Sequence, residues 1–179
     1  MLLSQMAGSV DNNGAFDLVI SEHRPGTEPP PHIHSREDEL FYVLSGEMRV
    51  YADGEIFTVT AGECMFLPRR KPHAWLITSD EARLLIVITP GGFTGAFHKM
   101  CAPAEWMDIP TDSETVTYAT ADPAETIKLF DQYGVRFLTP DEIRAEIPGY
   151  PFPAASPAIV GKPQSLLRVG TPDVSRRAS

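Results

Sequence analysis

The fold of this chain is decided by the segment Gly26-Thr-Glu-Pro-Pro-Pro-His32-Ile-His34-Ser-Arg-Glu-Asp-Glu39-Leu-Phe-Tyr-Val-Leu-Ser-Gly46. His32 and His34 are two positions apart, so an extended backbone directs both imidazoles to the same face. Glu39 lies an odd number of residues beyond His34, and a continuous strand would place its carboxylate on the opposite face. The polar residues 35–38 predict a turn that brings the carboxylate back towards the imidazoles.

A third imidazole follows in the sequence Pro68-Arg-Arg-Lys-Pro72-His73. Three imidazoles and one carboxylate suit one divalent transition metal ion (Fe, Mn, Ni, Co or Zn) and leave room for water or a substrate oxygen. We therefore predict a metal centre made of His32, His34, Glu39 and His73. The remaining histidines, His23 and His98, have no ligand spacing and are expected to be structural.

The two histidine-containing segments resemble the sequence motifs of the cupin superfamily. The first motif, G-x5-H-x-H-x4-E-x6-G, is matched at each fixed position, by Gly26, His32, His34, Glu39 and Gly46. The second motif, G-x5-P-x-G-x2-H-x3-N, is matched at Gly62, Pro68 and His73. Arg70 stands where this motif has glycine and Ile77 where it has asparagine, and neither departure removes a metal ligand. The resemblance covers about residues 14–90 and implies a metal held inside a jelly-roll barrel.

Composition and charge are those of an ordinary soluble domain. The 179 residues suffice for one domain, and 42% of them are hydrophobic and 22% charged. A net charge of -9 argues against nucleic acid as a partner. The two cysteines, Cys64 and Cys101, have no disulfide-framework or redox spacing. We find no signal-peptide pattern and no apolar run long enough to cross a bilayer, so a cytoplasmic location without membrane contact is expected.

Short strand patterns separated by turn residues fill the first half of the chain. About six to eight such strands predict an all-β fold with an antiparallel barrel or sandwich, and the cupin resemblance specifies a double-stranded β-helix, or jelly roll. Short C-terminal helices and an extended tail should follow. We expect the barrel to occupy residues 1–100, a short-helix segment that packs on it residues 101–147, and a proline-rich tail residues 148–179.

The run Leu40-Phe-Tyr-Val-Leu44 is apolar on both faces of the expected strand. Phe41 and Val43 share the parity of Glu39 and should face the interior, which leaves Leu40, Tyr42 and Leu44 facing outward. An outer face this apolar needs a cover. We expect the C-terminal segment and a second subunit of a homodimer to contribute to it.

Aromatic and aliphatic side chains are expected around the exchangeable positions of the metal. Trp75 and Ile77 share the parity of His73, and the expected substrate pocket consists of Phe41, Phe66, Trp75 and Ile77. Such walls suit a small aromatic substrate, for example an enol or phenol beside a ketone, together with O2. The metal would lower the pKa of a bound hydroxyl, and Glu39 would accept that proton as ligand and general base.

Among cupins, residues 29–46 and 68–75 are most similar to the bacterial quercetin 2,3-dioxygenase-like group. This resemblance implies oxidative cleavage of a flavonol's heterocyclic ring with release of carbon monoxide, Glu39 accepting the 3-hydroxyl proton. Three alternatives stay open. They are an isomerase or lyase that uses the metal as a Lewis acid without O2, a specialised biosynthetic enzyme, and a cupin that binds a small molecule without turnover.

Overall fold

The computed structural model describes residues 1–104, 109, 123–151 and 168–170. Its strands are β1 (Leu2–Ala7), β2 (Asp17–His23), β3 (His32–His34), β4 (Asp38–Ser45), β5 (Glu47–Ala52), β6 (Glu55–Thr60), β7 (Cys64–Leu67), β8 (His73–Ile77), β9 (Ala82–Thr89), β10 (Ala102–Pro103), β11 (Val135–Phe137) and β12 (Arg168–Gly170). Its helices are the short 3-10 helix η1 (Ser9–Asp11), α1 (Thr94–Met100), α2 (Pro123–Gln132) and α3 (Pro140–Glu146). None of the helices in these described ranges has the length and apolar character that a bilayer span requires.

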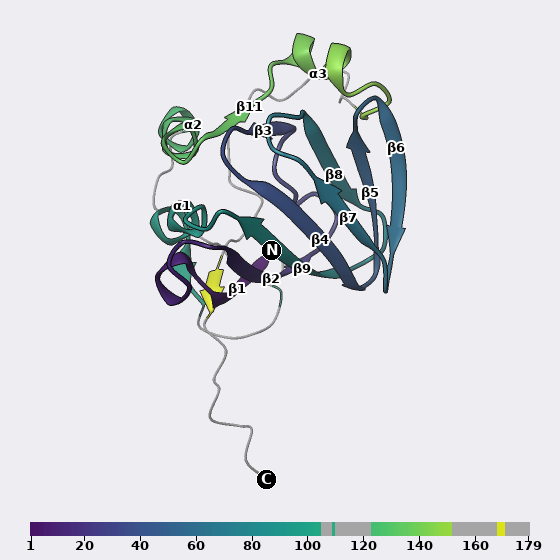
Figure 1. Ribbon diagram of the computed structural model, residues 1–179. Coiled ribbons are helices and arrows are strands. Elements are labelled where there is room, and N and C mark those ends of the chain that lie inside the picture. Colours follow the sequence, from purple (N-terminus) through teal and green to yellow (C-terminus); the bar gives the residue numbers. More distant parts are fainter. Residues whose placement is uncertain (105–108, 110–122, 152–167, 171–179) are drawn as a thin grey trace.

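Two sheets face each other across the core in the described part of the chain (Figure 1). One has the order β10-β12-β1-β2-β9-β4-β7, and the other has the order β11-β3-β8-β5-β6. The pairs inside the barrel are antiparallel, as between β4 and β9 or β5 and β8. The predicted all-β jelly roll, with short helices after it, is therefore confirmed. Of the predicted extended tail, residues 152–167 and 171–179 lie outside the described residues.

Burial alternates along the barrel strands with the period of two that an extended backbone imposes. In β4, Phe41 and Val43 are buried, whereas Leu40, Tyr42 and Leu44 are 36%, 40% and 40% exposed. This confirms the predicted assignment of inner and outer faces for the strand. Because Glu39 has the same parity as Phe41, the alternation also directs its carboxylate into the barrel.

Gly46 makes the tight turn between β4 and β5, with a φ of +83°. A Cβ at this position would lie 2.4 Å from the carbonyl oxygen of Glu81 and 2.8 Å from Cα of Ala82. Both the left-handed backbone and the close approach of a neighbouring chain segment therefore require glycine. The turn fixes where β4 ends and so helps to set the register of the strand that carries Glu39.

The segment after the barrel contributes a strand as well as helices. The expected helices are present, and α3 begins with Thr139 and Glu142 in a reciprocal capping box. Between α2 and α3, β11 pairs antiparallel with β3 and so joins the five-stranded sheet. This strand was not expected from the sequence. It lies against the strand that carries two of the predicted metal ligands (Figure 1).

A second unexpected addition extends the other sheet. β12 pairs parallel with β1 and with β10, beyond the antiparallel strands of the barrel. Residues 168–170 of the predicted tail therefore take part in the sheet. The barrel, helical-segment and tail boundaries at residues 100 and 147 stay predictions, although both later segments share sheets with the barrel.

Arg70, which replaces the motif glycine, adopts the left-handed conformation that glycine favours, with a φ of +64°. Its backbone N–H donates to the carbonyl oxygen of His34 at 2.6 Å, so this loop is tied to β3. The neighbouring Arg69 reinforces the attachment, since its guanidinium lies 2.6 Å from the carboxylate of Asp38. The loop thus keeps the motif's backbone geometry at the energetic cost of a strained arginine.

Replacing Arg70 by Gly is expected to stabilise the metal-free protein. Relief of the left-handed backbone strain should raise the free energy of unfolding by about 1–2 kcal/mol. The greater conformational freedom of glycine in the unfolded chain should offset about 0.5–1 kcal/mol of that gain. The melting temperature should rise by about 1–4 °C. The control is Arg70→Ala, which removes the same side chain but retains the Cβ. Equal melting temperatures for the two variants would contradict the assignment of strain.

Candidate metal centre

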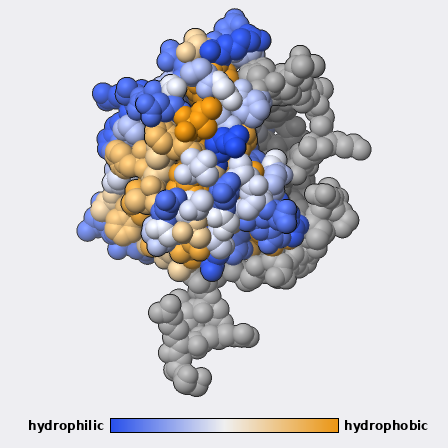
Figure 2. Space-filling view, turned by 90° about the vertical axis from the view of Figure 1, so that its right-hand side faces the viewer, coloured by the Kyte–Doolittle hydropathy of each residue, from blue (hydrophilic) through white to orange (hydrophobic). Residues whose placement is uncertain are grey.

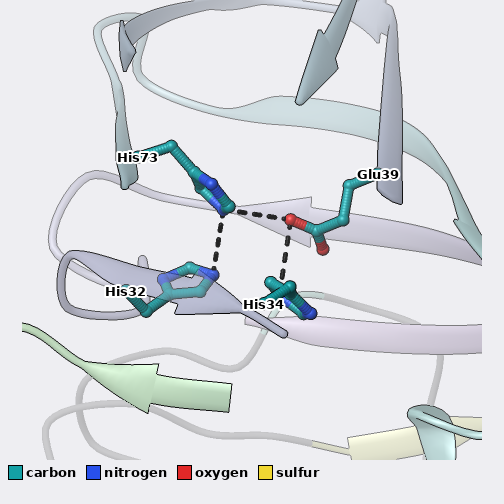
Figure 3. Close-up of side chains that lie close together, drawn as sticks. All are labelled: His32, His34, Glu39 and His73. Carbon is teal, nitrogen blue, oxygen red and sulfur yellow. Dashed lines mark hydrogen bonds and ion pairs between the residues drawn. The ribbon is translucent and has the colours of Figure 1, made fainter. Parts of the chain in front are cut away.

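The four predicted ligands come together inside the barrel from three strands. His32 and His34 lie on the inner face of β3, Glu39 lies on β4 and His73 begins β8. His32 and His73 are direct partners in the pairing of β3 with β8. Figure 3 shows the four side chains pointing towards one another. All four are buried, with exposed fractions between 1% and 6%.

The spacing of the ligand atoms fits a single ion. One nitrogen or oxygen from each residue lies within 4.8 Å of those of the other three. Nε2 of His73 is 3.2 Å from Nε2 of His32 and 3.2 Å from Oε2 of Glu39, and that Oε2 is 3.5 Å from Nε2 of His34. An ion that binds nitrogen and oxygen at about 2.0–2.2 Å separates adjacent ligand atoms by about 3–3.6 Å. The cluster therefore could hold a metal ion.

The Glu39 carboxylate provides a second test of the fit. Its Oε2 atom is buried and has no hydrogen-bond partner among the described residues. A buried acceptor left in this way costs about 1–3 kcal/mol, and more when it is charged. A cation held between this oxygen and the three imidazoles would satisfy it.

Burial and charge interactions shift the pKa values of three of these groups. Burial alone would lower the pKa of His34, but the charges of Glu39 and Glu37 and the hydrogen bond to Glu37 outweigh it and raise that pKa. Burial alone would raise the pKa of Glu39, but the charges on His34 and His73 outweigh it and hold that pKa at about 2. Burial, together with repulsion from His73 and His34, lowers the pKa of His32 to about 3. Near neutral pH Glu39 is therefore ionised and His32 is neutral, which are the protonation states that metal binding requires.

The other ring nitrogen of each histidine fixes its orientation. Nδ1 of His32 lies 2.8 Å from the carbonyl oxygen of Pro30, and Nδ1 of His73 lies 3.1 Å from that of Lys71. A carbonyl oxygen only accepts, so Nδ1 carries the proton in both rings and Nε2 offers its lone pair to the centre. Nδ1 of His34 lies 3.3 Å from the Glu37 carboxylate. Sequence reasoning had placed Glu37 only in a polar turn.

The two histidines without ligand spacing lie outside the cluster, as expected. His23 is buried, with its ring nitrogens against the hydroxyls of Ser21 and Thr27, and burial lowers its pKa to about 3. His98 lies exposed in the last turn of α1 and bonds to the Gln5 side chain. Both are structural residues with other partners.

Three of the four expected pocket residues lie in the barrel interior. Phe41, Trp75 and Ile77 are buried, and the rings of Phe41 and Trp75 have centroids 5.6 Å apart. Phe66 does not join them, because it is 54% exposed on the outer face of β7. It pairs with Leu40 across the strands, whereas the adjacent Leu67 pairs with Glu39 and takes the inward position. The prediction that Phe66 lines the pocket is therefore wrong.

Other aromatic residues, which sequence reasoning missed, lie closest to the ligand histidines. The Phe93 ring centroid is 5.0 Å from that of His34, and the Phe137 centroid is 6.3 Å from that of His32. Phe130 of α2 contacts both of these phenylalanines. The available signal was the alternation of Val135 and Phe137 about Arg136, which is typical of a half-buried strand.

Comparison with known proteins agrees with this geometry. Residues 19–89 match the family model described as "Cupin domain". Quercetin 2,3-dioxygenase from Bacillus subtilis (strain 168) is 26% identical over 113 residues, which are 63% of this chain and 34% of that protein. Polyketide synthase CurC from Streptomyces cyaneus is 32% identical over 79 residues, which are 44% of this chain and 50% of that protein. The chain thus spans half or less of the length of these two relatives.

Similarity to solved structures is more distant. A Klebsiella pneumoniae protein with a double-stranded β-helix domain is 19% identical, with a TM-score of 0.43 over 49% of this chain and 70% of that chain.

Proposed function

Residues 19–89 form a cupin domain, and from that premise we propose that this protein is a metal-dependent cupin oxygenase that acts on a small aromatic substrate with O2. The observation that carries the proposal is the buried cluster of three imidazoles and one carboxylate, in which Glu39 Oε2 has no hydrogen-bond partner among the described residues. This arrangement suits one divalent transition metal ion, Fe, Mn, Co, Ni or Zn.

His32, His34, His73 and Glu39 would hold the ion. A bound ion of this kind supplies a Lewis acid that lowers the pKa of a coordinated hydroxyl and, if it is redox-active, a site for O2 chemistry. The protein's own part is to hold the three imidazoles in place, to exclude water and to accept a proton. Glu39 performs the last of these, because its ionised carboxylate reaches the centre from the strand opposite β3.

The substrate class follows from the apolar surroundings of the centre. Phe93 and Phe137 lie against the histidines on one side, and Phe41 and Trp75 fill the barrel interior. Apolar aromatic surroundings with few polar groups suit a flat ligand that has adjacent oxygens. The relative named quercetin 2,3-dioxygenase supports a flavonol or a related enol beside a ketone. Glu39 would accept the proton of its hydroxyl, and the heterocyclic ring would be cleaved with release of carbon monoxide.

A second candidate function uses the same cluster of possible ligands. In that case the same ligands would hold an ion that acts as a Lewis acid in an isomerisation or elimination, without O2. The two candidates differ in oxygen consumption, so one experiment separates them.

Elemental analysis of the purified protein, combined with oxygen uptake and carbon monoxide detection on a panel of flavonols, tests the proposal. We expect one transition metal ion per chain, oxygen consumption that depends on a flavonol, and carbon monoxide release. Bound metal without oxygen uptake on any flavonol would overturn flavonol oxygenation and favour the Lewis-acid candidate. Protein that takes up no transition metal would overturn both.

We also propose that two copies associate through the outer face of β4 and β7. Leu40, Tyr42 and Leu44 are at least 36% exposed there, and Phe66 lies beside Leu40 at 54%. Figure 2, viewed from the β6 side, shows hydrophobic side chains gathered on part of the surface of the molecule. Exposed apolar clusters of this kind mark association surfaces.

Light scattering at micromolar concentration is therefore expected to give twice the chain mass of 19.7 kDa. Leu40→Glu should shift the protein towards monomer, because it places a charge in the apolar contact. The control is Val10→Glu, at a residue that is 90% exposed in η1. A monomeric mass for the unaltered protein would refute the dimer.

A further inference from the structure

One buried carboxylate near the centre is not used by the proposed chemistry. Glu37 lies between β3 and β4 and is only 5% exposed, although the residues before it, Ser35 and Arg36, are exposed. Its Oε2 atom lies 3.3 Å from Nδ1 of His34, on the side of the ring away from the metal cluster. Acidic side chains are rarely buried to this extent unless they are paired.

The partner of Glu37 makes His34 different from the other two ligand histidines. Nδ1 of His32 and Nδ1 of His73 each face a backbone carbonyl oxygen, which is neutral. Nδ1 of His34 faces a carboxylate oxygen at 3.3 Å, an acceptor that can form a charge-assisted hydrogen bond. A ligand histidine that donates to a carboxylate is held in one tautomer and becomes a stronger electron donor at its metal-binding nitrogen.

Glu37 is the second buried carboxyl group at the centre. Glu39 is one buried carboxyl group of the cluster, and Glu37 places a second within hydrogen-bonding distance of a ligand histidine. Two buried carboxylates are costly without compensation. Arg69 directs its guanidinium to Asp38. A divalent cation in the cluster would lie close to both buried carboxyl groups.

We infer that Glu37 is a positioning residue for the metal centre: it holds His34 with Nε2 directed at the ion. This inference rests on the proposed metal site and deepens it. Glu37 does not touch the ion or a substrate. Its effect passes through His34, so it determines how tightly the ion is held.

Co(II) affinity, measured by competition with a chromophoric chelator, tests this role in the full-length protein. Glu37→Gln keeps the shape and a hydrogen-bond acceptor but removes the charge, and affinity should fall by about 10- to 100-fold. Glu37→Leu removes both and should lower affinity further. The visible absorption bands of bound Co(II) should shift in both variants, because the donor strength of His34 changes.

The matched control is Asp17→Asn, at another fully buried carboxylate. Oδ2 of Asp17 accepts from the backbone N–H groups of Gly92 and Thr94 at 2.9 and 3.0 Å, so its loss should lower the melting temperature without changing Co(II) affinity or spectrum. Unchanged affinity and spectrum in Glu37→Gln would overturn the role of Glu37 while leaving the metal site in place. Unaltered protein that binds no Co(II) would overturn the metal site and this inference together. Glu37→Gln serves as the decisive variant if Glu37→Leu does not fold.

Discussion

Replacing Glu39 by Gln is expected to leave the fold intact, weaken metal retention and reduce turnover by about 10²–10⁴-fold, the range for loss of a general base. The amide has nearly the same shape as the carboxylate, so the packing around β4 should persist. It carries no charge to balance the ion and cannot take a proton from a substrate hydroxyl. The ionised state of Glu39, with its pKa held at about 2, is what the substitution removes.

Oxygen uptake at saturating metal separates the loss of metal affinity from the loss of the general base. Excess ion restores metal occupancy, but it does not replace the missing base. The control is Glu63→Gln, at an exposed carboxylate that accepts hydrogen bonds from Thr60 in the turn before β7. Circular dichroism should report the same fold for both variants. If Glu39→Gln turns over at the rate of the unaltered protein, Glu39 is not the base.

Replacing His73 by Ala should lower metal affinity by more than about 100-fold, which is the upper range for losing an outer hydrogen-bond partner of a ligand. Nε2 of His73 lies 3.2 Å from both His32 Nε2 and Glu39 Oε2, so its removal opens one side of the cluster. The protein purified from metal-supplemented cultures should then contain little transition metal. Elemental analysis measures this directly.

Two histidines of the same chain provide matched controls. His23→Ala removes an equally buried imidazole that packs edge-on against Trp75, so it should destabilise the fold by creating a cavity. His98→Ala removes an exposed imidazole from α1. Neither residue belongs to the metal cluster, and both variants should retain their metal. Equal metal loss in all three variants would show that the ligand histidines were assigned incorrectly.

Local periodicity predicts the strands of the barrel and which of their side chains face inward, whereas the convergence of His73 with the other three ligands is what the resemblance to the cupin motifs implies. The spacing of His32 and His34 fixes their shared face, and the parity of Glu39 with Phe41 fixes which side of β4 is buried. Motif spacing also locates Arg70 at a position where the backbone has a positive φ. Each of these features needs only a few neighbouring residues.

Features that depend on pairing between distant segments were not predicted. Phe66 was expected inside, but the pairing of Leu67 with Glu39 gives the inward position to leucine. Glu37 belongs to the polar run of residues 35–38, which predicts an exposed turn. Only the folded structure shows that its carboxylate points inward to His34. The pairing of β11 with β3 joins residues 101 to 105 positions apart, and the adjoining hydrogen bond from Ser35 to Gly134 spans 99 positions. Three-residue strands carry little periodic signal.

The pairing of β11 with β3 determines which parts of the chain hold the ligand-bearing strand in place. β11 matches all three residues of β3, whereas β8 pairs with it at His32 alone. The strand that presents His32 and His34 is thus anchored mainly by residues 135–137. Because coupling between two binding equilibria is reciprocal, an ion whose binding orders β3 would also stabilise the pairing of β3 with β11. The barrel and β11 together therefore hold His32 and His34 in place.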